Sequence, residues 1–600
     1  MKRLTLFCLA LLAASCLFSL PVGAEPTHDA RFLKVAVAYE LHADGSWDMT
    51  CEHQVRLDTY YAFNRALGET FIVYNPEFQK LEILKSETTM AGGRKVPSPE
   101  NAFNEVLPFP AHYFADFSHL REMVVTHTGL ERGAMVDLKY RIHTQAGFLP
   151  AFSGREVLSR DFPVDKYRLE IKVPAGQTLR YRVFSSPAAA KVSDSGAGKL
   201  YTFELASLPP AAHEPMAAAG SEPAVVFSTA ADWPQALALA ADPAPLPAVL
   251  QDRIGRLVTH YPGRPDLMAE LQKIVAVEMK GCRLGGEATG WQPRPLARVF
   301  QSNYGTRLEK ALLLRAMMKQ AGIEAELLAV AGGDALAADL PAFQAIGEFW
   351  LKTSGPHALY LDPWQEQQEF FPYRLQERDA WNLEKKTLEK LPASERQGSG
   401  VEVSGTVQLT ADGVSGNLVV AARGIFNRYN EATADPGKFI TGILKRIFPV
   451  EKAEVGKLLE LTRQQTRAEV TFSGKWLKET GPGFLAADVV RLPGLAENMV
   501  ILDKRESPLA LDAPFQVSLN LEIQPAKGLK LEYAAPNLER RNELGHYARG
   551  LVIEKKGLLR FSQSIALDKA LIGPEKYPLL RELLLPYFAP DLWLLFKKEK

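Results

Sequence analysis

Two long stretches of this 600-residue chain alternate short apolar runs with polar residues, and a stretch with helical spacing separates them. The alternating pattern runs from Phe32 to about Ala206 and returns from about Val401. A side-chain period of two is typical of half-buried antiparallel strands. The intervening segment, from about Val249 to Glu326, has its apolar residues at helical spacing. Because a chain of this length exceeds what one hydrophobic core can hold, the sequence predicts a multidomain α+β protein.

The first alternating stretch has the turn signals between strands that are typical of a β-sandwich. Asp44-Gly45 is a hairpin signal, and turns rich in Gly, Pro and Asn separate the other runs. The predicted strands are 32–39, 71–74, 81–84, 123–126, 136–142 and 167–173.

Composition shifts divide the chain further. A Pro- and Ala-rich stretch at 207–248 indicates a linker. It would join an N-terminal β-sandwich at 25–206 to an α+β domain at 249–395, which a mainly-β domain at 396–600 follows. In the middle domain short strands are expected at 348–352 and 358–362. In the last domain strands are expected at 401–409, 418–420, 515–523 and 551–565, and helices at 439–463 and 577–585.

Residues 1–24 have the organisation of a secretory signal. Lys2 and Arg3 precede an apolar stretch, and Val22-Gly23-Ala24 forms a small-residue cleavage site. The sequence therefore predicts a periplasmic or secreted protein. A weaker alternative is lipidation at Cys16, which follows Ala13-Ala14-Ser15. After this segment no run of 18 apolar residues occurs, so no transmembrane segment is expected in the mature chain.

The charge balance narrows the classes of partner. Lys and Arg together number 70, as do Asp and Glu, so the formal net charge is zero. A nucleic-acid-binding surface normally carries a basic excess. We therefore expect no nucleic-acid partner, and the sequence leaves the oligomeric state open.

The segment that starts at Tyr304-Gly305-Thr306-Arg307 and continues through Lys310-Ala311 to Ala321-Gly322-Ile323 resembles the nucleophile helix of the transglutaminase-like superfamily. Exported bacterial members usually carry Gly-Asp-Cys-Lys-Asp-Lys-Ala at this point. The resemblance implies a papain-like α+β core and places Arg307 at the position of the nucleophilic cysteine. A thiolate gains nucleophilicity at a helix N-terminus, but an arginine there cannot attack an acyl group.

The other two members of the triad also follow from the resemblance. Leu359 to Trp364 resembles the strand that carries the triad aspartate, which would be Asp362. The base histidine would lie about fourteen residues upstream, where this chain has Glu348. His357 is expected in the turn between the two strands. Since a lone carboxylate catalyses nothing, the resemblance implies a degenerate site at Arg307, Glu348 and Asp362 with no catalytic residue, and no cofactor is expected.

A purely structural role also accounts for the helix that begins after Thr306, without any catalytic activity. Thr306 and Glu309 have the spacing of a capping box. Arg307 in the first turn opposes the helix dipole, so we expect it to pair with a carboxylate.

The alternative is a cysteine-dependent peptidase or transglutaminase whose nucleophile lies elsewhere. After signal removal the chain keeps Cys51 and Cys282, which are expected in different domains as buried free thiols. Cys282 follows a predicted helix instead of starting one, so its position does not favour catalysis.

A second resemblance covers roughly residues 30–180. Tyr74-Asn75-Pro76, Pro99 to Val106 and Ser118 to Thr126 resemble a domain family of unknown function that precedes transglutaminase-like domains in exported bacterial proteins. It implies a β-sandwich and no activity. Six polar residues of these segments either line a recognition groove or form a buried network that braces long loops, and the network is favoured. They are Glu100, Asn101, Asn104, His119, Arg121 and Glu122.

Three histidines of this region, His112, His119 and His127, are candidate metal ligands by residue type. His119 and His127 are eight residues apart, about 27 Å along a continuous strand. These two histidines cannot share an ion unless the chain folds back. The sequence therefore predicts no metal site.

The functional prediction from the sequence is a non-catalytic protein. It would bind a peptide or protein in the cell envelope or serve as a scaffold there.

Overall fold

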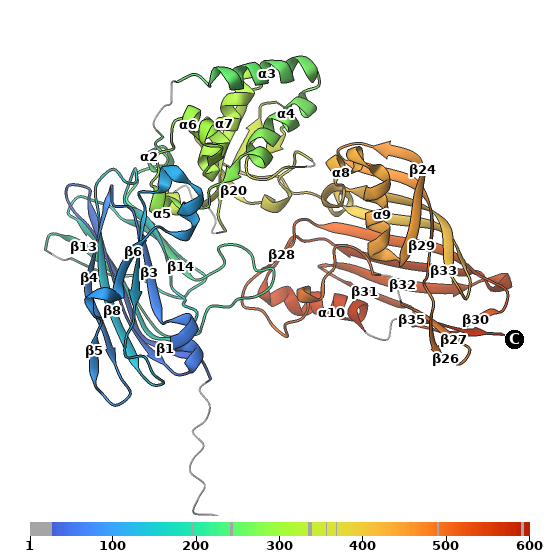
Figure 1. The fold of residues 1–600 in the computed structure, drawn as a ribbon, viewed down its shortest axis with the longest axis horizontal. Helices are drawn as coiled ribbons and strands as arrows, with labels where there is room; N and C mark the ends of the chain where they lie inside the picture. The colour runs from blue at the N-terminus through green and yellow to red at the C-terminus, as the bar shows by residue number, and fades with distance from the viewer. Residues whose placement is uncertain are drawn as a thin grey trace, which may run out of the picture.

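The computed structural model describes residues 27–599, except 195, 240–243, 334–335, 337–338, 356, 368, 489–490 and 590–592. The predicted signal segment 1–24 lies outside the described residues. Three parts follow one another along the chain (Figure 1). A strand-rich N-terminal part is joined to a mixed middle part, and a second strand-rich part ends the chain. The expectation of a multidomain, strand-rich protein is confirmed.

The N-terminal part is built on an eight-stranded sheet with the order β12-β13-β10-β1-β2-β8-β4-β5. β1 and β10 are parallel, and the other neighbours are antiparallel. The strands are β1 (Ala30–Leu41), β2 (Trp47–Leu57), β4 (Gln79–Thr89), β5 (Lys95–Pro97), β8 (Met135–Thr144), β10 (Val164–Pro174), β12 (Lys191–Asp194) and β13 (Gly198–Leu208). β1 and β2 form the hairpin expected at Asp44-Gly45, where Gly45 has a φ of +86°.

Two small sheets cover one face of this large sheet. The sheet β3-β7-β6 places Ile72 and Val125 against Leu138 and Ile142. The sheet β11-β14-β9 packs its apolar residues over β1 and β10, where Tyr39 and Phe227 have ring centroids 5.1 Å apart. The strands are β3 (Glu69–Tyr74), β6 (Phe103–Val106), β7 (Arg121–Thr126), β9 (Ser153–Val157), β11 (Arg180–Phe184) and β14 (Ala224–Ser228).

The opposite face of the large sheet is polar and meets solvent. Cross-strand ion pairs run along it, including Lys34 with Glu52 and Arg141 with Glu82. Alternation of core-facing and solvent-facing residues explains why the strand pattern was readable in the sequence.

The middle part sets helices against a five-stranded sheet with the order β19-β18-β17-β20-β21. Its helices are α3 (Ala248–His260), α4 (Arg264–Lys273), α5 (Gly286–Thr289), α6 (Leu296–Ser302) and α7 (Arg307–Gln320). Its strands are β17 (Ala325–Ala331), β18 (Ile346–Thr353), β19 (Tyr360–Leu361), β20 (Asp379–Asn382) and β21 (Thr387–Lys390). α7 packs on β17 and β18 through Leu313, Leu314 and Met317, all of which are fully buried. Helices precede strands here, as the sequence predicted.

The segment 207–248 is not the loose linker that its composition indicated. Residues 224–228 form β14, in which all five side chains are buried, and α2 (Trp233–Ala236) follows. The apolar run Val225-Val226-Phe227 can complete a sheet whatever the surrounding Pro and Ala content. Further upstream, the Ala218 amide donates to the Pro508 carbonyl at 2.8 Å. This segment therefore ties the N-terminal part to the C-terminal part (Figure 1).

The C-terminal part carries an eight-stranded sheet with the order β24-β25-β23-β22-β29-β33-β32-β31 and a four-stranded sheet with the order β26-β27-β35-β30. The first sheet contains β22 (Gly400–Leu409), β23 (Val414–Arg423), β24 (Val450–Leu461), β25 (Gln465–Gly474), β29 (Phe515–Pro525), β31 (Leu538–Asn542), β32 (Gly545–Ile553) and β33 (Leu559–Leu567). The second contains β26 (Lys478–Gly481), β27 (Phe484–Asp488), β30 (Leu529–Ala534) and β35 (Trp593–Lys598). A two-stranded sheet pairs β28 (Leu509–Ala510) with β34 (Leu571–Ile572).

The helices of this part are α8 (Tyr429–Ala434), α9 (Pro436–Ile447) and α10 (Tyr577–Phe588). The expected helix at 577–585 is confirmed. The expected helix at 439–463 is wrong after Ile447, because Pro449 cannot continue a helix and β24 begins at Val450. β24 is an edge strand rich in charge, and its spacing resembles that of an amphipathic helix. The run 551–565 is a hairpin of β32 and β33, with Gly557 in its turn at a φ of +77°. Within the described residues, no helix is long and apolar enough to cross a membrane.

Candidate functional site

The N-terminus of α7 is held by a capping box. The Thr306 hydroxyl accepts from the Glu309 amide, and the Glu309 carboxylate accepts from the Thr306 amide at 2.8 Å. Thr306 and Glu309 therefore satisfy two amides that the first helical turn leaves open. Gly305 precedes the cap in β16 (Tyr304–Gly305), a two-residue strand parallel to β15 (Lys280–Gly281). The predicted capping box is confirmed.

Arg307 is the first residue of α7, and its side chain is 41% exposed. One guanidinium nitrogen lies 3.6 Å from Glu348 Oε2. The guanidinium carbon also lies 4.8 Å from the ring centroid of Trp364, within cation–π range. The carboxylate partner expected for Arg307 is therefore Glu348, the residue at the position where the resemblance implied a histidine.

Arg374 joins Glu348 to Asp362. Its guanidinium donates to Glu348 at 3.1 and 3.2 Å, and to Asp362 Oδ2 at 2.6 Å. The Asp362 side chain is buried at 3% exposure, and the Glu348 side chain is mostly buried at 15% exposure. Trp350 Nε1 adds a hydrogen bond to Glu348 at 3.0 Å. Arg307, Glu348, Arg374 and Asp362 thus form a continuous ion-pair network, called the Arg307 network below.

The two carboxylates respond differently to burial. Burial acts to raise the pKa of Glu348, but Arg374, Trp350 and Arg307 bring it below its usual range. Burial raises the pKa of Asp362 above its usual range, although Arg374 opposes that shift. Lys310, one turn along α7, is 1% exposed and lies over Trp364. Burial lowers the pKa of Lys310 to about 8. The Arg307 network therefore pairs two guanidinium groups with two carboxylates, and the Lys310 amine lies beside it.

Acyl transfer by a catalytic triad has a geometric requirement. A nucleophile must stand within hydrogen-bond reach of a base that a third group orients. At the positions that the resemblance assigns to a triad, this chain has a guanidinium and two carboxylates, and Arg374 engages both carboxylates. His357 is exposed in the segment between β18 and β19, as expected. The network can bind charge and fix geometry, but it holds no nucleophile.

Cys282 lies beside the residues that precede α7, where its amide donates to the Gly305 carbonyl at 2.8 Å. Its side chain is buried with Phe114, Phe117 and Tyr304. Burial raises the pKa of the Cys282 thiol to about 11, and burial does the same for Cys51. Both cysteines are free thiols. A thiol of this kind is almost entirely protonated at neutral pH, which disfavours the cysteine-dependent alternative.

An ion-pair chain connects the α7 cap to the N-terminal part. Arg294 donates to Glu309 Oε1 and Oε2, each at 2.9 Å, and also to Asp116. Arg298 donates to the same aspartate. Hydrogen bonds from Arg298, with help from Arg294, lower the pKa of Asp116 to about 2. Asp116 belongs to the short helix η4 (Ala115–Phe117), so residues of the N-terminal part help to hold the start of α7.

The six polar candidates from the N-terminal part do not form one buried network. Glu100, Asn101 and Asn104 are exposed, which contradicts the bracing role favoured for them. Arg121 does brace a loop, because it donates to the carbonyls of Ser118, His119 and Leu120. His119 lies 3.9 Å from the Glu77 carboxylate. Loop carbonyls therefore accept side-chain hydrogen bonds from Arg121 and also from Asn104, whose Nδ2 donates to the Asn101 carbonyl at 3.1 Å.

Glu122 and Asn104 instead share the outer face of the sheet β3-β7-β6. In register, Val73 pairs with Glu122 and Glu122 with Val106, while Phe71 pairs with Val124 and Val124 with Asn104. Phe71 is 57% exposed, and Val73 and Val106 are exposed as well. We call Phe71, Val73, Asn104, Val106, Glu122 and Val124 the outer face of the small sheet. Its apolar content had no signal in the sequence beyond ordinary strand alternation.

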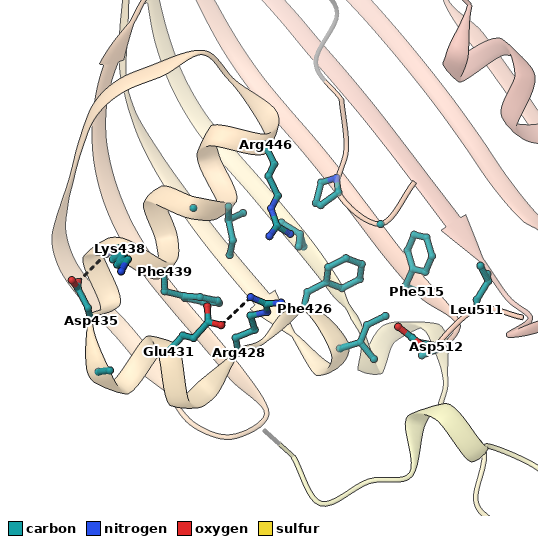
Figure 2. Close-up of a pocket in the computed structure, with 18 of the residues that line it drawn as sticks. Phe426, Arg428, Glu431, Asp435, Lys438, Phe439, Arg446, Leu511, Asp512 and Phe515 are labelled. Carbon is teal, nitrogen blue, oxygen red and sulfur yellow. Dashed lines mark hydrogen bonds and ion pairs between the residues drawn. The ribbon is translucent and has the colours of Figure 1, made fainter. Parts of the chain in front are cut away.

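A cavity of about 870 Å³ lies between helices α8 and α9 and the C-terminal sheet (Figure 2). Phe426, Phe439 and Phe515 line it, and its charged rim includes Arg428, paired with Glu431 at 2.9 Å. Cavities of this size hold small ligands or several peptide side chains. The sequence did not single out these residues.

The three histidines considered as ligands are not brought together. His127 is buried, and its Nε2 lies 3.0 Å from Thr70 Oγ1. His112 lies on the short helix η3 (Phe109–Tyr113). A different group, His42, Asp48 and His143, gathers on the large sheet.

Comparisons with known proteins agree with this organisation. Residues 43–212 match DUF3857 and residues 488–587 match DUF3858, each a domain of unknown function with a solved structure. A crystal structure of a candidate protease from Parabacteroides distasonis ATCC 8503 aligns with a TM-score of 0.70 and 25% identity. The alignment covers 95% of this chain and 99% of that one. No curated protein matches the chain.

A further alignment, to the periplasmic domain of TgpA from Pseudomonas aeruginosa, has a TM-score of 0.16 and 17% identity. It covers 37% of this chain and 77% of that chain, and a score this low supports no argument. The DUF3857 match at residues 43–212 agrees with the resemblance described for residues 30–180. This chain therefore combines DUF3857 and DUF3858 domains in a fold that it shares along its length with the P. distasonis protein, a combination that fits a transglutaminase-like protein.

Proposed function

We propose that this protein is an exported, non-catalytic member of the transglutaminase-like superfamily that binds a peptide or protein partner in the cell envelope. Export rests on the signal-like segment 1–24. The papain-like assignment of residues 249–395 rests on the packing of α7 against β17 and β18, and on Arg307, Glu348 and Asp362 at the positions that the resemblance assigns to the triad. The N-terminal part is assigned as a β-sandwich and the C-terminal part as a mainly-β domain.

The observation that carries the non-catalytic role is the ion pair between Arg307 and Glu348. A guanidinium occupies the position of the nucleophile, and its partner occupies the position of the base. Arg374 also donates to Asp362, which joins this carboxylate to the same network. Each of the three assigned positions is thus held in an ion pair within one network. A protein can keep a fold without the catalytic activity that other members of the fold have.

The binding role rests on the outer face of the small sheet. β3 and β6 are the outer strands of a three-stranded sheet, and their outward side chains include the exposed apolar residues Phe71, Val73 and Val106. Apolar residues gathered on an exposed sheet are typical of interaction sites. A free strand edge can also accept an extended peptide as an added strand. We assign the partner to this face and the Arg307 network to the support of the fold.

The P. distasonis relative is named a candidate protease, so peptidase activity is the rival function. In this chain it would need Cys282, whose burial and raised pKa oppose it. Peptide hydrolysis and glutamine–amine crosslinking assays on the purified protein separate the two. We expect no turnover. Turnover that disappears in Cys282→Ser, with the protein folded, would establish the rival.

The binding role is tested by site-specific photocrosslinking in envelope preparations. A photoreactive residue placed at Val73, on the outer face, is expected to capture a defined partner. The same residue at Val192, which is 50% exposed on the edge strand β12, serves as the matched control. Loss of the Val73 adduct in a Phe71→Ser background supports the assignment. Equal capture at both positions, or capture that Phe71→Ser leaves unchanged, contradicts it.

A further inference from the structure

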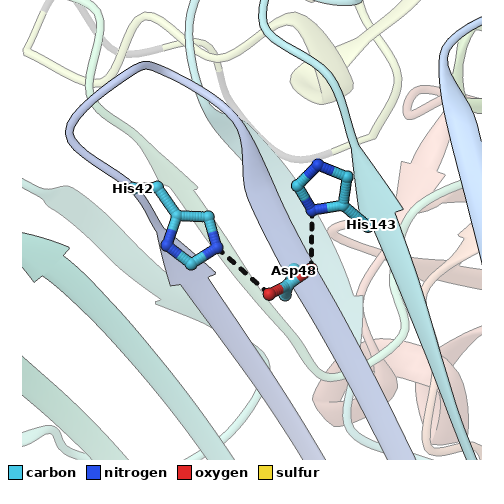
Figure 3. Close-up of side chains that lie close together, drawn as sticks. All are labelled: His42, Asp48 and His143. Carbon is cyan, nitrogen blue, oxygen red and sulfur yellow. Dashed lines mark hydrogen bonds and ion pairs between the residues drawn. The ribbon is translucent and has the colours of Figure 1, made fainter.

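Two histidines and an aspartate meet on the solvent-facing side of the large sheet (Figure 3). Asp48 lies on β2 and His143 on β8, and the two residues are directly opposite each other in the sheet register. His42 follows the last residue of β1, at the β1–β2 hairpin. The three side chains therefore come from neighbouring strands, although 95 residues separate Asp48 from His143 along the chain.

The ligand atoms of the three residues converge. His42 Nε2 lies 3.1 Å from Asp48 Oδ2, and His143 Nδ1 lies 2.9 Å from Asp48 Oδ1. All three offer a ligand atom within 4.8 Å of the other two. Two ligands of one Zn²⁺, each bound at about 2.0–2.2 Å, are themselves roughly 3.0–3.5 Å apart. The observed spacings require only small side-chain rotations to admit an ion.

The backbone around the group is well supported. The Asp44 carboxylate accepts hydrogen bonds from the Ser46 amide at 3.0 Å and from the Ser46 hydroxyl at 2.7 Å. The His42 amide donates to the Ser46 carbonyl at 2.8 Å, which closes the hairpin. Long strand pairing holds Asp48 and His143. Three ligand positions set by a sheet and a closed hairpin cost little to organise on binding.

The group is open on one side. The side chains of His42, Asp48 and His143 are 35%, 21% and 43% exposed, so a bound ion would keep water as a further ligand. Two imidazoles with one carboxylate suit borderline transition-metal ions, whereas Ca²⁺ and Mg²⁺ prefer oxygen ligands throughout.

Neighbouring charges determine the affinity that we expect for a metal ion at this site. A small depression brings Lys80, Glu82 and Arg141 beside Asp48 and His143, and Lys80 is directly opposite His143 in the register. Arg141 is paired with Glu82. The ammonium of Lys80, which lines the same depression, would repel a cation. We therefore expect moderate affinity that rises when this lysine is removed.

We propose that His42, Asp48 and His143 form a binding site for one divalent transition-metal ion of the Zn²⁺ class. The site lies outside the Arg307 network and outside the face assigned to the partner. It departs from the sequence expectation of no metal, because the chain folds back to join residues that the sequence keeps far apart.

Isothermal titration of tag-free, chelator-stripped protein with ZnCl₂ tests the site. We expect one ion per chain, and a weakening of at least about tenfold in Asp48→Asn and in His143→Gln. Lys80→Ala is expected to tighten binding. His213→Ala is the matched control, because His213 pairs with Asp161 at 3.1 Å in an exposed pair without a third ligand. CaCl₂ is expected to give no saturable binding.

Co²⁺ absorption provides an independent readout, since imidazole and carboxylate ligands give visible bands that disappear in Asp48→Asn. Circular dichroism shows whether each variant is folded, and the exposed position of the group makes misfolding an unexpected result. The proposal is overturned if Zn²⁺ gives no saturable binding, or if Asp48→Asn and His143→Gln bind as the parent protein does. Equal weakening in His213→Ala would also overturn it.

Discussion

Arg307 and Glu348 are 3.6 Å apart at the start of α7, where the cation faces the positive end of the helix dipole. A positive charge at this end is unfavourable by a few tenths of a kcal/mol to about 1 kcal/mol. The buried Glu348 carboxylate and the Trp364 ring offset that cost. The relationship explains why an arginine persists at a position suited to an anion.

Arg374→Ala is expected to be the most damaging change in the network. It leaves Glu348 and Asp362, both buried, without their shared guanidinium. Breaking a buried ion pair from one side costs about 3–5 kcal/mol, and the 35% exposure of the Arg374 side chain places this case near the lower end. Arg307→Ala is the matched control and should cost under about 1 kcal/mol, because Arg307 is more exposed. Chemical denaturation measures both, and equal losses would contradict the assignment of Arg374 as the central residue.

Restoring the triad positions should not restore an enzyme. In Arg307→Cys with Glu348→His, the helix N-terminus is expected to lower the pKa of the new thiol and speed its alkylation. Arg374 would still engage Asp362, so the new histidine would lack its orienting carboxylate and would face a guanidinium. We expect alkylation by iodoacetamide to be faster than that of Cys282, with no peptide turnover. Measurable turnover would show that the cleft retains catalytic geometry.

Both cysteines should be dispensable for function. Cys282 is 2% exposed and Cys51 is partly buried, and burial raises the pKa of each thiol to about 11. Cys→Ser at either position places a hydroxyl in an apolar site, at about 1–2 kcal/mol. Partner capture at Val73 is the functional readout. Rapid alkylation of native Cys282 at pH 6 would contradict the burial argument.

Asp116 should couple the N-terminal part to the start of α7. Asp116→Asn removes the charge that Arg294 and Arg298 share, and we expect a loss of about 1–3 kcal/mol. The pKa of Asp116 lies at about 2, below its usual value of 3.8, so the unfolded chain takes up the proton first as pH falls. The stabilisation is present above pH 4 and is lost towards pH 2. Thermal unfolding across this range should show a smaller acid loss in Asp116→Asn than in the parent, and identical profiles would refute the coupling.

His127 should contribute acid sensitivity at a higher pH. Burial lowers its pKa from 6.5 to about 4, and Nδ1 has no hydrogen-bond partner among the described residues. Since the unfolded state binds the proton first, this contribution to stability is present above pH 6.5 and is lost as pH falls to 4. The loss is at most about 3 kcal/mol. His127→Phe should flatten the denaturation profile in this window, although His53, with a pKa also lowered to about 4 by burial, contributes in parallel.

Local sequence patterns were sufficient to predict an element where a single structural feature produces the pattern. The strands at 32–39 and 136–142 alternate because one face of the large sheet packs on two smaller sheets and the other meets water. The capping box at Thr306 and Glu309 depends on residues three apart, so it too was readable. The helix expected at 439–463 failed beyond Ile447, because a charged edge strand and an amphipathic helix present similar spacing.

What the sequence by itself determined is therefore local: the strand and helix types, the cap of α7, and the identity of Arg307 where a nucleophile was expected. Tertiary structure alone decided which charges meet. Arg374 reaches Glu348 and Asp362, Asp116 reaches Arg294, and Asp48 stands between His42 and His143 only because distant strands and loops lie side by side. Such contacts depend on chain reversals and sheet register, which residue spacing does not encode, whereas periodicity follows directly from the geometry of a single strand or helix.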